Sequence, residues 1–291
     1  HFTVTEKPEV TLEANPDDLS AFYLSTLVKT PVNRFSIGVQ SFFDEDLQFM
    51  NRLHNAAEAE NAIKNAQAAG ITNISIDLIY GTPTLSNAMW ESNLQKAFAL
   101  GVPHLSCYCL TVEPHTALAY KVAKQQAPPV DEQKASEQFM FLMKTAALNG
   151  WWQYEISNLC KPDMLSKHNS NYWKNKKYLG IGPSAHSFNG TTRQWNVRNN
   201  HIYIQQITQG IIPAETEILN INERFNEFVM TSLRTMWGCN IVKVENTFGL
   251  SFASHLIKQA TPFVEKGEII FEENTMLLTP KGKIMADSIT S

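Results

Sequence analysis

Three polar side chains lie in three successive predicted strands, at or near the carboxyl end of each. They are Glu13, Gln40 and Asp77, and a Gly-Thr-Pro turn at 81–83 follows Asp77. Residues at the carboxyl ends of parallel strands usually bind ligands. Carboxylates and amides can hold an amino group and sugar hydroxyls. The pattern predicts a site for a small polar molecule, which the spacing alone does not name.

Motifs for several other kinds of chemistry are missing from the sequence. It contains no GxGxxG, P-loop, HExxH or nucleophile-elbow motif. The pair Gly180 and Gly182 is too short for a dinucleotide fingerprint. We assign no catalytic residue and no metal ligand from the sequence.

The elements that would position these side chains alternate between strand and helix. Predicted strands cover residues 10–15, 34–40, 73–80 and 104–112, and predicted helices cover 44–53, 56–69 and 87–100. Such alternation predicts an α/β fold with a parallel sheet and right-handed crossovers.

Each of the first three strands keeps one small or polar face. In the strand 34–40, one face carries Phe35, Ile37 and Val39, and the other carries Ser36, Gly38 and Gln40. Strands of ordinary parallel sheets are apolar on both faces. We therefore expect a curved sheet whose helices cover the apolar face and whose polar face lines a ligand cavity. The alternative, an antiparallel sheet with a solvated face, is disfavoured by the helical connections.

The chain after residue 112 is less regular. We expect a loop or lid over 113–130, a helix over 131–148, a strand over 151–156 and a polar, aromatic loop over 158–179. From residue 221 onward, helices followed by a β-hairpin predict a winged-helix-like module. Residues 240–288 carry five lysines and six acidic residues, which favours packing over DNA binding.

Composition excludes some classes of function. The net charge of −4 disfavours a nucleic-acid partner, and no apolar run approaches the roughly 18 residues of a membrane span. The four cysteines are few and scattered, which favours a reducing cytoplasm over a disulfide framework. The chain begins with His1 and opens almost directly into a strand, so we expect a fragment of a longer protein.

Four segments resemble signatures of the oxygen-independent coproporphyrinogen III oxidases, which belong to the radical S-adenosylmethionine (SAM) proteins. They are Thr11–Pro16, Ile37–Ser41, Asn51–His54 and Ile76–Pro83. The resemblance implies an incomplete parallel (β/α)6 barrel with a C-terminal helical, winged-helix-like module. It divides the chain into a partial barrel (1–112), a barrel extension (113–220) and the C-terminal module (221–291).

The resemblance also implies roles for five residues in cofactor binding. Glu13 and Gln40 match SAM contacts, Arg52 matches the arginine that reaches the methionine carboxylate, Asp77 matches an aspartate near the adenosine, and Ile79 lies beside the adenine. These chemical types suit the implied partners, since Arg suits a carboxylate and acids suit an ammonium group. The structural alternatives are a surface Arg52 and a structural Asp77.

One feature of the family is missing. Its CxxxCxxC motif, which holds a [4Fe–4S] cluster, does not occur in this sequence, nor does its GGGTP turn. Three thiolates are needed to hold the cluster and leave one iron open for SAM. We expect SAM and the cluster in the intact protein, and an inactive fragment that binds neither cofactor stably.

Residues 154–186 resemble the HemW-type haem chaperone branch, in which an HNxxYW segment is linked to haem binding. That segment gives His168 as a candidate haem ligand, with Tyr172 and Trp173 packing the macrocycle. The alternative is that His168 fixes a loop through hydrogen bonds, and the sequence leaves both open.

Three hypotheses of function follow. The first is a HemW-like haem chaperone, with haem and haem-receiving proteins as partners. The second is a coproporphyrinogen III oxidase that forms protoporphyrinogen IX by oxidative decarboxylation. The third is a binding module without chemistry. The sequence does not decide whether the protein is an enzyme, although few basic residues are well placed to clamp the carboxylates of an oxidase substrate.

Overall fold

A computed structural model describes residues 4–290 and divides the chain into two compact units, residues 1–166 and 167–291. The division falls within the segment 113–220 that we expected to be a barrel extension, rather than at 112 or 220. Each unit has its own sheets and helices, and they are described separately below.

The first unit is built on a six-stranded sheet with the order β1-β2-β3-β4-β6-β5. Its strands are β1 (Thr11–Ala14), β2 (Arg34–Gln40), β3 (Ile74–Tyr80), β4 (His104–Cys109), β5 (Trp152–Gln153) and β6 (Asn158–Cys160). The first four strands are parallel, which confirms the predicted α/β class, and β6 then pairs antiparallel with both β4 and β5.

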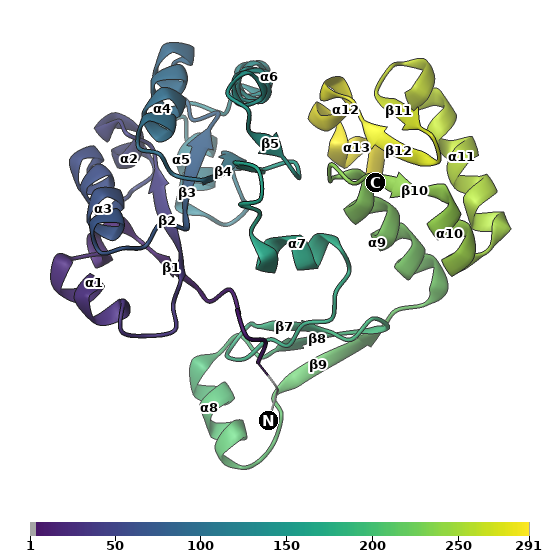
Figure 1. Ribbon diagram of the computed structural model, residues 1–291, viewed down its shortest axis with the longest axis horizontal. Helices are drawn as coiled ribbons and strands as arrows, with labels where there is room; N and C mark the ends of the chain where they lie inside the picture. The colour runs from purple at the N-terminus through teal and green to yellow at the C-terminus, as the bar shows by residue number, and fades with distance from the viewer. Residues whose placement is uncertain (1–3, 291) are drawn as a thin grey trace. The chain divides into compact units, whose positions relative to one another are not determined.

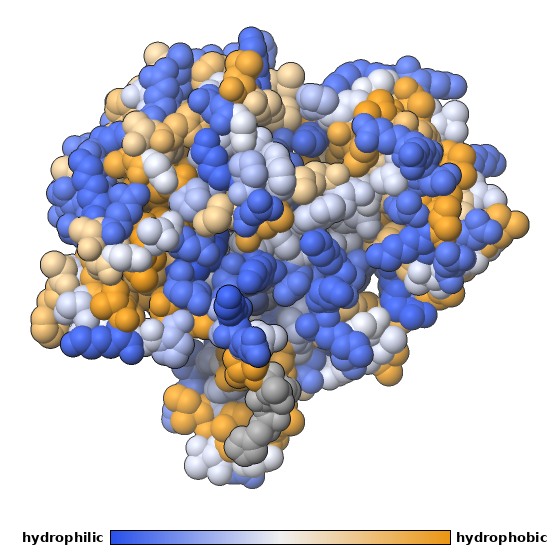
Figure 2. Space-filling model, viewed as in Figure 1, coloured by the Kyte–Doolittle hydropathy of each residue, from blue (hydrophilic) through white to orange (hydrophobic). Residues whose placement is uncertain are grey.

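The helices of this unit connect the strands (Figure 1). They are the 3-10 helix η1 (Pro16–Asp18), α1 (Ala21–Leu27), α2 (Asp44–Phe49), α3 (Ala56–Ala68), α4 (Asn87–Ala99), α5 (Ala117–Ala123) and α6 (Glu132–Leu148). Helix α3 begins with a capping box in which Asn55 and Glu58 satisfy each other's backbone N–H groups. Figure 2 shows hydrophilic side chains over much of the outer surface of α3 and α4.

The core of the unit lies between these helices and the apolar face of the sheet. The inner strands bury branched and aromatic side chains completely, namely Phe35, Ile37, Val39, Ile74, Ile76 and Leu78. Helix α3 contributes a matching stripe, Ala59, Ala62, Ile63 and Ala66. Each large apolar side chain removed from water stabilises the fold by about 1.5–3 kcal/mol. The helices therefore cover the apolar face, and the polar face is left for other contacts.

Two parts of this unit differ from the sequence prediction. The expected loop at 113–130 contains the short helix α5, which Thr116 caps through its side chain. The expected strand at 151–156 is only two residues long and forms a hairpin with β6, which we had placed in a loop. Gln153 makes a hydrogen bond from its side chain to the Ile156 carbonyl, and this contact favours a tight turn over a continued strand.

The second unit contains two antiparallel sheets. Its first part is α7 (Lys167–Trp173), β7 (His186–Phe188), β8 (Thr192–Asn196), α8 (Asn200–Thr208) and β9 (Ala214–Ile218), with the sheet order β7-β8-β9. Helix α7 occupies the middle of the segment 158–179, which the sequence predicted as a loop, and that prediction is wrong there.

The C-terminal part has the order of a winged helix. It consists of α9 (Ile221–Leu233), β10 (Cys239–Asn240), α10 (Ile241–Phe248), α11 (Leu250–Glu265), β11 (Ile269–Glu272), β12 (Thr275–Leu278), α12 (Pro280–Ile284) and α13 (Ala286–Thr290). The rings of Phe225, Phe248 and Phe252 pack between its helices. The predicted hairpin turns at Glu273, whose φ of 52° is left-handed. No helix within residues 4–290 is long and apolar enough to cross a membrane.

Candidate functional site

Strand register brings polar side chains of the sheet together on one face. Glu13 of β1 lies opposite Ser36 of β2, and Ser36 lies opposite Ser75 of β3. Asp77 of β3 lies opposite Ser106 of β4. The polar face expected from the sequence is therefore continuous across four parallel strands, with two carboxylates among hydroxyl groups.

Asp77 has the most perturbed carboxyl group on this face. Burial raises its pKa to about 6, and the charge of Glu13 acts in the same direction. Hydrogen bonds from Ser106 and Ser36 and the charge of Arg34 oppose this rise in pKa. A carboxyl group in this environment gains from a ligand that donates hydrogen bonds or carries positive charge, because such a ligand stabilises its ionised form.

A buried histidine, His104, lies at the amino-terminal end of β4 on the same polar face. His104 contacts the Ser75 hydroxyl through Nδ1 at 2.7 Å and the Tyr154 hydroxyl through Nε2 at 2.8 Å. Burial and the charge of Arg34 lower the pKa of His104 to about 3. The imidazole is therefore neutral at physiological pH, and it fixes the base of the polar face.

Gln40 ends β2 in an unusual backbone conformation. Its φ is +67°, in the left-handed region, and the residue is only 8 % exposed. A Cβ atom on Gly38 would lie 2.8 Å from the Gln40 amide nitrogen. The amide therefore lies over Gly38, which has no side chain to displace it. Backbone strain of this kind costs on the order of 1–3 kcal/mol and persists where surrounding contacts enforce it.

Asp46 of α2 supplies those contacts. Its carboxylate is fully buried and accepts hydrogen bonds from Ser41 at 2.9 Å, Thr82 at 3.1 Å and Thr84. Asn93 extends the network by donating to the Ser41 hydroxyl at 3.1 Å. The network ties the residue after Gln40 to the turn after β3. Sequence reasoning missed Asp46, because it is the third of three consecutive acids, Asp44 to Asp46, and the sequence does not show which of them is buried.

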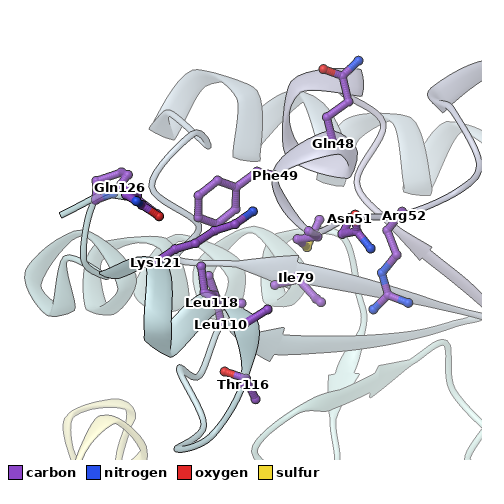
Figure 3. A pocket seen from close by; sticks show the side chains of 14 residues that line it. Gln48, Phe49, Asn51, Arg52, Ile79, Leu110, Thr116, Leu118, Lys121 and Gln126 are labelled. Carbon is purple, nitrogen blue, oxygen red and sulfur yellow. The ribbon is translucent and has the colours of Figure 1, made fainter. Parts of the chain in front are cut away.

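Arg52 and Ile79 line a cavity of about 610 Å³ between the end of α2, β3 and α5 (Figure 3). The Arg52 Nε atom is buried and has no hydrogen-bond partner within the described part of the chain. Asp77 and Ile79 are two residues apart on β3 and so share a face, but Glu13, Gln40 and Asp77 do not line this cavity. The structure thus brings Arg52 and Ile79 together in the cavity. It brings Glu13 and Asp77 together on the adjoining polar face of the sheet.

The three haem candidates lie on α7, in the second unit. His168 and Tyr172 are one turn apart, and their rings meet edge to face at 4.8 Å. Trp173 lies beneath the Arg234 guanidinium at 5.9 Å, and its indole nitrogen is buried without a hydrogen-bond partner in residues 4–290. The helix therefore places the His168 imidazole against the Tyr172 ring, whereas Trp173 packs against Arg234.

The cysteines do not form a donor set for an iron–sulfur cluster. Cys107, Cys160 and Cys239 are buried, and burial raises the pKa of each thiol. Cys109 is exposed. Among the described residues, no three His, Cys, Asp or Glu side chains are placed to hold one metal ion. By contrast, the buried acid and the unpartnered Arg52 fit the ammonium, hydroxyl and carboxylate groups of SAM.

Comparison with known proteins defines the family. The chain is 33% identical to the haem chaperone HemW of Bacillus subtilis over 97% of this chain and 74% of that protein. It is 31% identical to the haem chaperone HemW of Lactococcus lactis, with the same coverage. The chain belongs to the HemW family of radical SAM proteins. Models of the radical SAM superfamily and of the HemN C-terminal domain match residues 3–97 and 219–284, respectively.

A solved structure agrees with the fold of this HemW-family chain. The coproporphyrinogen III oxidase HemN of Escherichia coli, described as a radical SAM enzyme, superposes with a TM-score of 0.79 over 97% of this chain and 68% of that one. The two sequences are 20% identical, so the likeness concerns the fold. It confirms the predicted radical SAM architecture followed by the C-terminal module.

Proposed function

We propose that this HemW-family protein binds haem and delivers it to other proteins, and that it is not a coproporphyrinogen oxidase. The observation that carries the proposal is the similarity to several proteins named haem chaperones, over 97% of the chain. The likeness to the oxidase rests on the fold at 20% identity. The partners we propose are haem and haem-receiving proteins.

For SAM, we assign the polar face of the sheet and the adjoining end of α2. Asp77 and Glu13 would accept hydrogen bonds from the ammonium and hydroxyl groups, and Gln40 would bind through its amide. Arg52 would pair with the methionine carboxylate, because its Nε is buried and unpartnered among residues 4–290. Ile79 would pack against the adenine. A bound cluster and SAM together supply radical chemistry in this family, and we assign no cluster ligand to the described residues.

Haem is assigned to α7. His168 would ligate the iron, and Tyr172 and Trp173 would pack against the macrocycle. The four cysteines are free thiols, which supports our placement of the protein in the reducing cytoplasm.

A haem titration tests whether His168 coordinates the haem iron. We expect His168→Ala to shift the Soret band and to weaken haem binding, whereas His201→Ala, an exposed histidine of α8, should change neither. An unchanged spectrum and affinity in His168→Ala would remove His168 from the site.

Turnover separates the two functions. Because the described residues offer no cluster ligands, the family's CxxxCxxC segment is first joined to the N-terminus of the chain. This extended protein is treated anaerobically with iron, sulfide and SAM, and is then incubated with coproporphyrinogen III. We expect no protoporphyrinogen IX, together with transfer of bound haem to an apo-haemoprotein. Formation of protoporphyrinogen IX would favour the oxidase and contradict the chaperone proposal.

A further inference from the structure

Large apolar side chains are exposed on and around α8, in the second unit. Helix α8 buries none of its residues and contains no Lys, Arg, Asp or Glu. Figure 2 shows hydrophobic side chains over this helix. The exposed apolar residues, which we call the isoleucine patch, are Leu179, Ile181, Ile202, Ile204, Ile207, Ile211 and Ile212. An exposed helix normally carries charged side chains, so an apolar one without charge indicates a contact surface.

Backbone hydrogen bonds bring the three segments of the patch together. The Gly182 N–H donates to the Tyr203 hydroxyl of α8 at 3.1 Å, which holds the loop 179–182 against the helix. The Ile211 N–H donates to the Gln206 carbonyl at 2.9 Å, which folds the next loop onto the end of the helix. The patch is therefore one surface built from a helix and two loops.

The surroundings of the patch are positively charged. Residues 167–214, which contain the whole patch, include six Lys or Arg residues and no Asp or Glu, in a chain whose net charge is −4. Lys176, Lys177 and Arg198 are exposed and have no side-chain hydrogen bond or ion pair within residues 4–290. Acidic residues resume only at Glu215 on β9. Positive charge without nearby acids favours an anionic partner.

Exposed isoleucines flanked by cations are typical of surfaces that lie in the interface of an anionic membrane. A nucleic acid fits less well, because isoleucine offers no ring on which a base can stack. We propose that the isoleucine patch inserts between the headgroups of an anionic lipid surface, and that Lys176, Lys177 and Arg198 pair with the lipid phosphates. This contact is peripheral and requires no spanning helix, and it does not depend on the assignments of haem or SAM.

The test is flotation of the whole chain with vesicles of phosphatidylcholine and phosphatidylglycerol in equal parts, and with vesicles of phosphatidylcholine alone. We expect Ile204→Ser with Ile212→Ser to weaken binding to the mixed vesicles by about tenfold or more, because two apolar side chains no longer leave water. Lys176→Gln with Lys177→Gln should weaken that binding about thirtyfold and leave the weak binding to phosphatidylcholine unchanged.

The controls make the same chemical changes elsewhere on the surface. Ile204 and Ile212 are 64 % and 72 % exposed, and Leu148 and Leu250 are 77 % and 66 % exposed, so Leu148→Ser with Leu250→Ser matches the apolar change. Lys29→Gln with Lys144→Gln, at two exposed positions of the first unit, matches the loss of charge. Both control proteins should bind the mixed vesicles as the wild type does.

Three results would overturn the proposal. The first is a wild type that does not float with the mixed vesicles, or that is weakened equally by the patch and control changes. The second is a loss of binding with the lysine changes alone, which would show that the isoleucines do not insert. The third is a wild-type dimer in sedimentation velocity that ignores vesicles and dissociates in Ile204→Ser with Ile212→Ser. That result would make the patch an interface between two copies of this chain.

Discussion

The polar face of the sheet and the neighbouring cavity share β3 but have opposite charge. The face carries Glu13 and Asp77, and burial raises the pKa of Asp77 to about 6. The cavity carries Arg52 and Lys121 and no acid. Asp77 and Ile79, two residues apart on the same strand, belong to the face and the cavity respectively. The comparison shows that one strand can border an acidic surface and a basic cavity at positions only two residues apart.

The polar face and the cavity are also stabilised by different kinds of contact. The end of the polar face depends on a buried network around Asp46 and on the left-handed backbone of Gln40. The cavity depends on a short helix, α5, none of whose residues is buried. Substitutions in the buried Asp46 network should therefore cost much stability, whereas substitutions on α5 should cost little.

The largest effect is expected at Asp46. Asp46→Ala removes the acceptor of three hydroxyl groups, of which those of Ser41 and Thr82 are buried, so we expect a loss of about 3 kcal/mol in the free energy of unfolding. Urea denaturation measures it. Glu45→Ala, at an exposed position of the same helix, is the control and should stay within about 0.5 kcal/mol. If Asp46→Ala also lowered the free energy of unfolding by no more than about 0.5 kcal/mol, the hydrogen-bond network around Asp46 would not stabilise the end of β2.

Asp77→Asn should stabilise the protein at neutral pH. The pKa of Asp77 is above its unfolded value, so burying the ionised group is unfavourable, and the wild type loses stability as pH rises from about 4 through about 6. The asparagine variant should lack this loss and exceed the wild type by about 2–3 kcal/mol above pH 6. Parallel unfolding curves for the two proteins between pH 4 and pH 7 would contradict the burial of this carboxyl group.

Gly38→Ala should act through Gln40. The new methyl group would displace the Gln40 amide, so we expect about tenfold weaker binding of S-adenosylhomocysteine in calorimetry, equivalent to about 1.4 kcal/mol. Gln40→Ala should weaken binding by a similar factor, and the double variant should add little more. Additive losses would mean that Gly38 acts independently of Gln40. No loss in Gln40→Ala would instead remove Gln40 from the SAM site.

The sequence predicted the polar face because strand alternation is regular: Ser36 and Asp77 could be assigned to one side from their position in the chain. The amphipathic helices after residue 221 and the hairpin at Glu273 likewise allowed the winged-helix-like module to be predicted. It did not predict the left-handed φ of Gln40 or the role of Asp46, because both depend on contacts between segments far apart in the chain. Helix α7 and the β5–β6 hairpin were missed because short elements carry little periodic signal.

The pKa of Asp77 with and without ligand is the most direct test of the SAM site. A carbon-13 NMR titration of the aspartate carboxyl groups, assigned with Asp77→Asn, measures it. We predict titration near pH 6 in the free protein and a pKa at least one unit lower with saturating S-adenosylhomocysteine, because the ligand's ammonium or hydroxyl groups stabilise the ionised form. An unchanged pKa in the presence of bound ligand would place that ligand away from the polar face and contradict the assignment.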